Sequence, residues 1–155
     1  MDESRLDKVI VMSDESHEYL VKLDWTHGRV GNLTVEGKTK IQVSAPPEFD
    51  GPEGIISPED LFVAAATSCF MTTFVTFTKK MHIEFKSFAC DGYGTLERVE
   101  KGFQFTKILL KTKVVVESEE LVSKAEKAME LAGKYCLVSN SMKCPTEHEN
   151  KIVVG

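Results

Sequence analysis

The sequence lacks the features that mark nucleic-acid-binding and exported proteins. It has 19 Lys and Arg residues against 24 Asp and Glu residues, which gives a formal net charge of −5 at pH 7. Proteins that bind nucleic acid need a basic surface, so this balance argues against such a partner. The first 12 residues, MDESRLDKVIVM, are acidic and contain no apolar signal region. We therefore expect a cytoplasmic protein without a membrane partner.

Cysteine pairs at the C-x-x-C spacing of many metal sites are also missing. The four cysteines are Cys69, Cys90, Cys136 and Cys144. Cys144 and His148 could be imagined as metal ligands, but without a C-x-x-C pair we expect neither a metal nor another cofactor. In a cytoplasmic chain such cysteines are more often free thiols, redox centres or ligands than structural disulfides.

Internal repeats, low-complexity tracts and interdomain linkers are absent as well. The chain has 155 residues, of which 42% are hydrophobic and 28% charged. A composition of this kind is globular, and a chain of this length can bury a sizeable core. We therefore expect residues 1–155 to form a single domain.

An uncharged stretch runs from residue 61 to residue 78 and reads LFVAAATSCFMTTFVTFT. Six of its residues are Ser or Thr and three are Ala. It is therefore too polar to favour a membrane span, which needs about 20 mainly apolar residues. Ser57 is suited to cap a helix, and the Pro-Glu-Asp that follows suits its first turn. We predict a helix from residue 58 to about residue 82 that is buried on all sides.

Alternation of polar and apolar residues predicts strands on both sides of this helix. The first strands are joined by short glycine-containing turns and should form an antiparallel meander. The expected strands are residues 17–25, 29–35, 39–44, 83–96, 103–117 and 151–154. Apolar residues at helical spacing predict a second helix that ends at Gly133. Residues 135–143 should form a third, short helix that carries Cys136.

This order of elements predicts an α+β fold in which antiparallel sheets pack around a long buried central helix. A three-stranded meander cannot by itself surround a helix that is apolar on every side. A second copy of the chain could supply the missing cover, so we expect an intertwined homodimer.

Cys69 lies in the middle of the uncharged helix, and two interpretations of it are open. A free cysteine is often a small buried hydrophobe, and position alone favours that interpretation. Catalysis would need a neighbouring cation or a helix N-terminus to lower the pKa of the thiol. The middle of a helix gains little from the helix dipole, so a cation would have to come from elsewhere in the chain.

Two segments carry a family likeness. Residues 57–65 read SPEDLFVAA and are followed by Cys69, and residues 135–143 read YCLVSNSMK around Cys136. The two cysteines are 67 residues apart. Together these segments resemble the two motifs of the OsmC/Ohr family, the osmotically inducible and organic hydroperoxide resistance proteins, in the family's order. The sequence departs from the pattern at Leu137, where the family often has proline.

The resemblance implies a thiol peroxidase that reduces organic hydroperoxides to alcohols. Cys69 matches the peroxidatic cysteine and Cys136 the resolving cysteine, so a disulfide would join them during turnover. Arg29 would stabilise the Cys69 thiolate, and Glu59 would orient Arg29 through a forked ion pair. A dithiol would re-reduce the protein, and in the family this dithiol is typically carried by a lipoyl-bearing protein.

Apolar residues near Cys69 would suit an alkyl or lipid-like hydroperoxide. They are Phe62, Phe70, Met71 and Phe74. Cys90 and Cys144 match no residue of the family's active site. The alternative is a non-enzymatic protein on the same scaffold that binds a small hydrophobic ligand in an apolar pocket.

The spacing of Glu59 and Cys69 restricts how such a site can be built. Ten residues separate them, and ten residues of helix span about 15 Å. If both lie on one continuous helix, they cannot contact the same arginine. We therefore expect each site to take Arg29 and Glu59 from the partner chain.

Overall fold

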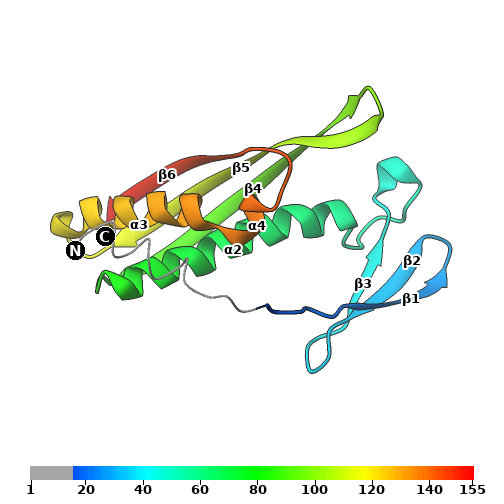
Figure 1. Ribbon diagram of the computed structural model, residues 1–155, viewed down its shortest axis with the longest axis horizontal. Coiled ribbons are helices and arrows are strands. Elements are labelled where there is room, and N and C mark those ends of the chain that lie inside the picture. Colours follow the sequence, from blue (N-terminus) through cyan, green and yellow to red (C-terminus); the bar gives the residue numbers. More distant parts are fainter. Residues whose placement is uncertain (1–15) are drawn as a thin grey trace. The chain divides into compact units, whose positions relative to one another are not determined.

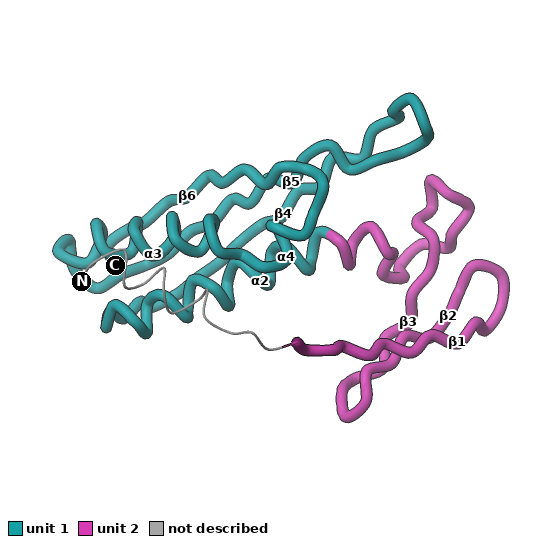
Figure 2. Tube along the Cα trace, viewed as in Figure 1, with its two compact units in different colours: residues 1–12, 63–155 teal, residues 13–62 magenta. Residues whose placement is uncertain are grey.

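The computed structural model describes residues 16–155, which divide into two compact units. The first unit extends to Phe62 and the second runs from Val63 to Gly155 (Figure 2). Each unit contains a three-stranded sheet, and the second also contains helices, so the predicted α+β class is confirmed. The acidic segment MDESRLDKVIVM, which bears on export, lies outside the described residues.

The first unit is a meander of three antiparallel strands. These are β1 (Lys22–His27), β2 (Val30–Thr34) and β3 (Ile41–Ser44), followed by the short 3-10 helix η1 (Pro47–Phe49). The meander is predicted correctly, but β1 begins later than residue 17. Thr34 is the last residue of β2 and pairs with Lys22, so pairing with β2 does not extend to residues 17–21.

The long helix α2 (Pro58–Lys80) begins at the end of the first unit and continues into the second. At its start, the Asp60 N–H donates to Ser57 Oγ at 3.1 Å and the Ser57 N–H donates to the Asp60 carboxylate at 2.9 Å. This reciprocal capping confirms Ser57 as the start of the helix. At the other end, His82 adopts a left-handed conformation with φ of 54°, which ends the helix close to the predicted position.

The second unit combines a mixed sheet with the remaining helices. The sheet contains β4 (Ser87–Val99), β5 (Gly102–Val116) and β6 (Thr146–Val154), and the chain from β5 to β6 forms η2 (Glu119–Leu121), α3 (Val122–Tyr135) and α4 (Leu137–Asn140) (Figure 1). β4 and β5 are antiparallel, whereas β6 pairs with β5 in parallel. The sequence predicts only antiparallel pairing, and this prediction is wrong for β6. A helical crossover returns the chain in the same direction, which allows parallel pairing.

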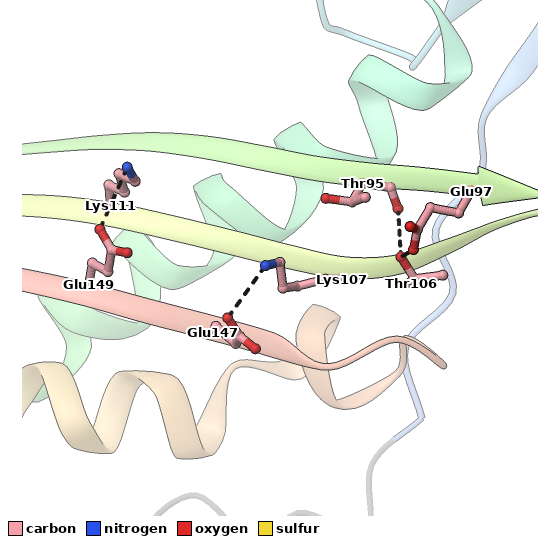
Figure 3. A network of polar contacts seen from close by, with 7 residues as sticks. All are labelled: Thr95, Glu97, Thr106, Lys107, Lys111, Glu147 and Glu149. Atoms are coloured by element: carbon pink, nitrogen blue, oxygen red, sulfur yellow. Dashed lines mark hydrogen bonds and ion pairs between the residues drawn. The ribbon is translucent and has the colours of Figure 1, made fainter.

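β6 is longer than the predicted residues 151–154 because its polar first half also joins the sheet. Glu147 Oε2 lies 3.8 Å from Lys107 Nζ of β5, and Glu149 Oε2 lies 3.7 Å from Lys111 Nζ of the same strand (Figure 3). Both pairs are largely exposed, and each is worth at most about 1 kcal/mol. The first half of β6 contains few apolar residues, so its hydrophobic pattern does not reveal it as a strand.

α2 packs one face against the sheet of the second unit. Phe70, Phe74 and Phe77 are fully buried, and the rings of Phe70 and Phe74 lie 6.1 and 5.2 Å from the ring of Phe88 on β4. By length and composition α2 could also span a membrane, and 28% of its apolar stretch is buried within the chain. Within residues 61–78, the exposed positions are Ala64, Ser68, Met71, Thr72 and Thr76. Residues 16–155 therefore do not bury α2 on all sides, whereas the sequence predicts a helix that is buried all round.

β4 lies close to α2 at its glycines. A Cβ at Gly92 would overlap Thr67 Oγ1 and lie 3.1 Å from Val63 Cγ1. The Thr67 hydroxyl is not free to turn away, because it donates to the Val63 carbonyl at 2.8 Å. Glycine at this position thus sets how closely the helix that carries Cys69 packs on the sheet.

We predict that Gly92→Ala lowers the free energy of unfolding by about 1–3 kcal/mol, because the added methyl group overpacks the contact between α2 and β4. Urea denaturation measures the loss. Thr67→Ala removes the overlapping hydroxyl, so the double variant Gly92→Ala/Thr67→Ala should lose less stability than the two single variants combined. Strictly additive losses would show that this contact does not limit the packing.

Candidate active site

α2 places Cys69 beside its buried aromatic face. Cys69 directly precedes Phe70, whose ring is fully buried, and its own side chain is half-buried. The hydroxyl of Thr73, one turn later, donates to the Cys69 carbonyl at 2.8 Å and lies 3.9 Å from the sulfur. The Cys69 sulfur therefore lies at the border between the packed and the exposed sides of the helix.

Cys136 lies at the break between α3 and α4. It adopts an extended conformation, with φ of −63° and ψ of 110°, so it separates the two helices. The sequence predicts Cys136 within a helix over residues 135–143, but the extended conformation excludes it and α4 is shorter. The side chain is fully buried, and the Ser139 hydroxyl donates to its sulfur at 3.3 Å.

The fold brings Cys69 and Cys136 together across 67 residues of sequence. Each cysteine shifts the pKa of the other, so their side chains lie close together, and both cysteines are free thiols. Packing of α2 against α3 supports this contact, since the rings of Phe77 and Tyr135 lie 5.8 Å apart and Tyr135 directly precedes Cys136. In this contact, α2 carries the sulfur of Cys69, and the residue that follows α3 carries the sulfur of Cys136.

The surroundings of the two thiols move their pKa values in opposite directions. Burial raises the pKa of Cys69, but hydrogen bonds from the Val138 N–H, the Cys136 thiol, Thr73 and the Leu137 N–H outweigh burial and lower it. The pKa of Cys136 is raised, chiefly by burial, and the negative charge on Cys69 adds to the rise. Cys69 is therefore the thiol that ionises first, and Cys136 remains the donor to it.

Sequence reasoning misses the backbone N–H donors to Cys69. It looks for a cation, whereas Leu137 and Val138 supply N–H groups from the first turn of α4, which have no partner within that helix. The signal in the sequence is a new helix start directly after Cys136. Only the packing of α4 shows that these N–H groups face the sulfur of Cys69.

Arg29 and Glu59 belong to the first unit. Arg29 is exposed in the β1–β2 turn, where the Trp25 indole N–H donates to the Gly28 carbonyl at 2.9 Å. Glu59 lies in the first turn of α2, and its Oε2 is buried without a hydrogen-bond partner among residues 16–155. Since α2 is continuous from Pro58 to Lys80, Glu59 and Cys69 are about 15 Å apart along it.

Two of the phenylalanines near Cys69 pack in the core. Phe70 contacts Phe88 and also His148, whose ring centroid lies 4.6 Å away, and Phe74 is equally buried. Both lie on the sheet-facing side of α2, so neither is exposed beside Cys69. Phe70 and Phe74 therefore belong to the core, whereas Phe62 is half-buried and Met71 is exposed. Leu137, adjacent to Cys136, is instead 71% exposed.

The remaining cysteines have other surroundings. Cys90 lies in β4 and accepts a hydrogen bond from the Thr112 hydroxyl at 3.2 Å. Cys144 is buried just before β6. Across residues 16–155, no three His, Cys, Asp or Glu side chains are grouped in a way that could hold a metal ion.

Comparisons with known proteins indicate one family for this chain. The model of the family described as OsmC-like protein matches residues 51–151. The uncharacterised protein YmaD of Bacillus subtilis (strain 168) is 25% identical over 130 residues, which are 81% of this chain and 87% of that protein. A solved OsmC-like protein of unknown function from Vibrio cholerae aligns with a TM-score of 0.79 and 26% identity over 87% of this chain and 99% of its own.

A solved organic hydroperoxide resistance protein from Elizabethkingia anophelis is also similar in structure. It aligns with a TM-score of 0.70 over 91% of this chain and 100% of its own. Its sequence is 20% identical, so this likeness concerns the fold.

Leu137→Pro tests the backbone donors because it removes one N–H, and the side chain that it also replaces is largely exposed. Leu137 is the first residue of α4, where proline is tolerated, and Cys136 already has the extended conformation that a residue before proline requires. We predict that the pKa of Cys69 rises. A smaller fraction is then thiolate at neutral pH, so iodoacetamide alkylates Cys69 more slowly.

A pH titration of the ultraviolet thiolate absorbance measures the change, in a background with Cys90 and Cys144 replaced by serine. Leu137→Ala is the matched control, because it keeps the N–H and shortens the side chain, and it should leave the pKa of Cys69 unchanged. If the proline and alanine variants titrate alike, the Leu137 N–H has no part in stabilising the thiolate.

Proposed function

Because the chain belongs to the OsmC-like protein family, we propose that it is a cysteine-based peroxidase that reduces organic hydroperoxides and so protects the cell against oxidative stress. The observation that carries this proposal is the close pair of Cys69 and Cys136, in which Cys69 is the more acidic thiol. A nucleophile of lowered pKa next to a second free thiol is the arrangement that a two-cysteine peroxidase needs.

The reaction begins with attack of the Cys69 thiolate on the terminal oxygen of the hydroperoxide. A sulfur–oxygen bond forms and the O–O bond breaks. The departing alkoxide takes a proton and leaves as an alcohol. Cys69 has then been oxidised to a sulfenic acid and the hydroperoxide has been reduced.

Cys136 completes the catalytic cycle as the resolving cysteine. Its sulfur attacks the sulfenic sulfur of Cys69, a disulfide forms, and the sulfenic oxygen leaves as water. A dithiol, such as the lipoyl group of a partner protein, then reduces the disulfide by thiol–disulfide exchange and is itself oxidised. The contact between the two side chains supports this step, because a disulfide needs the sulfurs to be adjacent.

Arg29 and Glu59 act on Cys69 from a partner chain in a homodimer. The buried, unpartnered Oε2 of Glu59 is suited to a guanidinium, and Arg29 is exposed in its turn. The distance along α2 prevents one arginine from contacting Glu59 and Cys69 of the same chain. Arg29 of the partner would add a positive charge to the N–H donors that already hold the Cys69 sulfur.

The exposed apolar surface supports the dimer. Trp25 on β1 is 74% exposed, and the uncovered side of α2 carries Met71 among small residues such as Ala64 and Ser68. Small residues let two helices approach closely, and a second α2 would cover this side as the core of a shared interface. We place the dimer in the cytoplasm, with the whole chain as one domain.

Mass spectrometry after one equivalent of cumene hydroperoxide tests the chemistry. We predict that each chain loses two hydrogen atoms and that Cys69 and Cys136 become crosslinked. Cys69→Ser should abolish peroxide consumption. Cys136→Ser should allow one turnover, after which further equivalents of hydroperoxide overoxidise Cys69 to a sulfinic acid. If neither cysteine changes, the chain is better interpreted as a non-enzymatic protein that binds a small hydrophobic ligand.

Mixed dimers test where Arg29 comes from. One chain carries Cys69→Ser and keeps Arg29, and the other carries Arg29→Ala and keeps Cys69. If the arginine acts across the dimer, the second chain's Cys69 meets the first chain's Arg29, and each mixed dimer has one intact site. We predict that differently tagged, co-purified mixed dimers reduce peroxide although both parent homodimers are impaired. Inactive mixed dimers would show that Arg29 acts within its own chain.

A further inference from the structure

The Ser139 hydroxyl contacts the second of the two sulfurs. It donates to Cys136 Sγ at 3.3 Å, and Ser139 itself is half-buried. The peroxidase chemistry proposed above gives this hydrogen bond no role until Cys136 reacts. Cys136 is fully buried, so at that moment it must develop negative charge away from water, which is costly without a hydrogen-bond donor.

The hydrogen bond is not required to form the local backbone. The turn after Cys136 is closed by main-chain bonds: the Asn140 N–H donates to the Cys136 carbonyl at 3.0 Å and the Ser141 N–H donates to the Val138 carbonyl at 3.0 Å. The Ser139 hydroxyl takes part in neither. A role in the chemistry of Cys136 is therefore separable from a role in folding.

Oxidation of Cys69 changes which charges and hydrogen bonds shift the pKa of Cys136. In the reduced protein, the negative charge on Cys69 and the hydrogen bond that Cys136 donates to it both raise the pKa of Cys136, on top of the larger effect of burial. The hydroxyl and the backbone N–H of Ser139 act in the opposite direction. Once Cys69 is a neutral sulfenic acid, its negative charge is gone, while the donors of Ser139 remain. Ionisation of Cys136 becomes easier only after Cys69 has reacted.

We propose that Ser139 is a positioning residue for the resolving step: its hydroxyl orients the Cys136 sulfur and stabilises the negative charge that this sulfur develops as it attacks the Cys69 sulfenic acid. The Cys136 proton passes to the sulfenic oxygen. The sulfur–sulfur bond forms as the sulfur–oxygen bond breaks, and water leaves. Throughout this step the Ser139 hydroxyl keeps its proton. This inference rests on the proposed peroxidase function.

Single-turnover kinetics of the full-length Ser139→Ala protein test the proposal. After mixing with cumene hydroperoxide, dimedone trapping follows the sulfenic acid, and non-reducing mass spectrometry follows the disulfide. Loss of a hydrogen bond to a charged group should slow disulfide formation about tenfold or more. The rate at which Cys69 is first oxidised should stay at its original value. At excess peroxide, more Cys69 should reach sulfinic acid before Cys136 can attack.

Two further variants separate this role from a structural one. Ser139→Thr keeps the hydroxyl and should restore rapid disulfide formation. Ser141→Ala is the matched control, because Ser141 follows α4 directly but its hydroxyl donates to the Leu137 carbonyl at 2.8 Å rather than to a sulfur. It should form the disulfide at the original rate.

The outcomes distinguish the inference from the function on which it rests. If Ser139→Ala forms the disulfide as fast as the original protein, or slows the first oxidation of Cys69 equally, Ser139 is not a positioning residue for resolution and the peroxidase proposal stands. If peroxide leaves Cys69 of the unsubstituted protein unoxidised, the peroxidase proposal itself fails.

Discussion

The contact of Cys69 on α2 with the segment around Cys136 gives two chemically identical side chains different acidities. Cys69 gathers donors from two backbone N–H groups, a threonine and the second thiol, whereas Cys136 is enclosed in the core. A thiolate is the reactive form of cysteine, so this difference distinguishes the two sulfurs before any partner or substrate arrives. The arrangement needs α2, the end of α3 and the start of α4 to meet at one point.

That meeting point depends on how α2 is packed. Its phenylalanines anchor one side in the core, and Gly92 lets β4 lie directly against it. Cys69 is adjacent to this anchored side, so the packing of the aromatic rings limits how far its sulfur can move. The position of Cys136 between α3 and α4 is fixed by the preceding residue, Tyr135, whose ring contacts Phe77 of α2. The core packing of α2 therefore also determines the geometry of the sulfur pair.

The opposite side of α2 follows a different rule. It is uncharged but only partly covered within the chain, and an exposed apolar surface of this kind marks an interaction site. The same helix thus has a packed core on one side and, in the homodimer proposed above, a surface for a second chain on the other. This explains why its sequence is apolar all round and shows little of the periodicity of an ordinary surface helix.

The sequence by itself determined the class of fold, the capped start of α2 at Ser57, the three-stranded meander and the two cysteine-bearing segments, because these depend on local periodicity, capping and motif residues. It did not determine the parallel pairing of β6, whose first half is polar and is recognised as a strand only beside β5. It did not determine which side of α2 faces the core, and the packing directs Phe70 and Phe74 there. Above all, it sought a cation for Cys69 and missed the N–H groups of Leu137 and Val138. Which backbone atoms face a distant sulfur depends on how helices far apart in the chain pack together, and only the tertiary structure decides that.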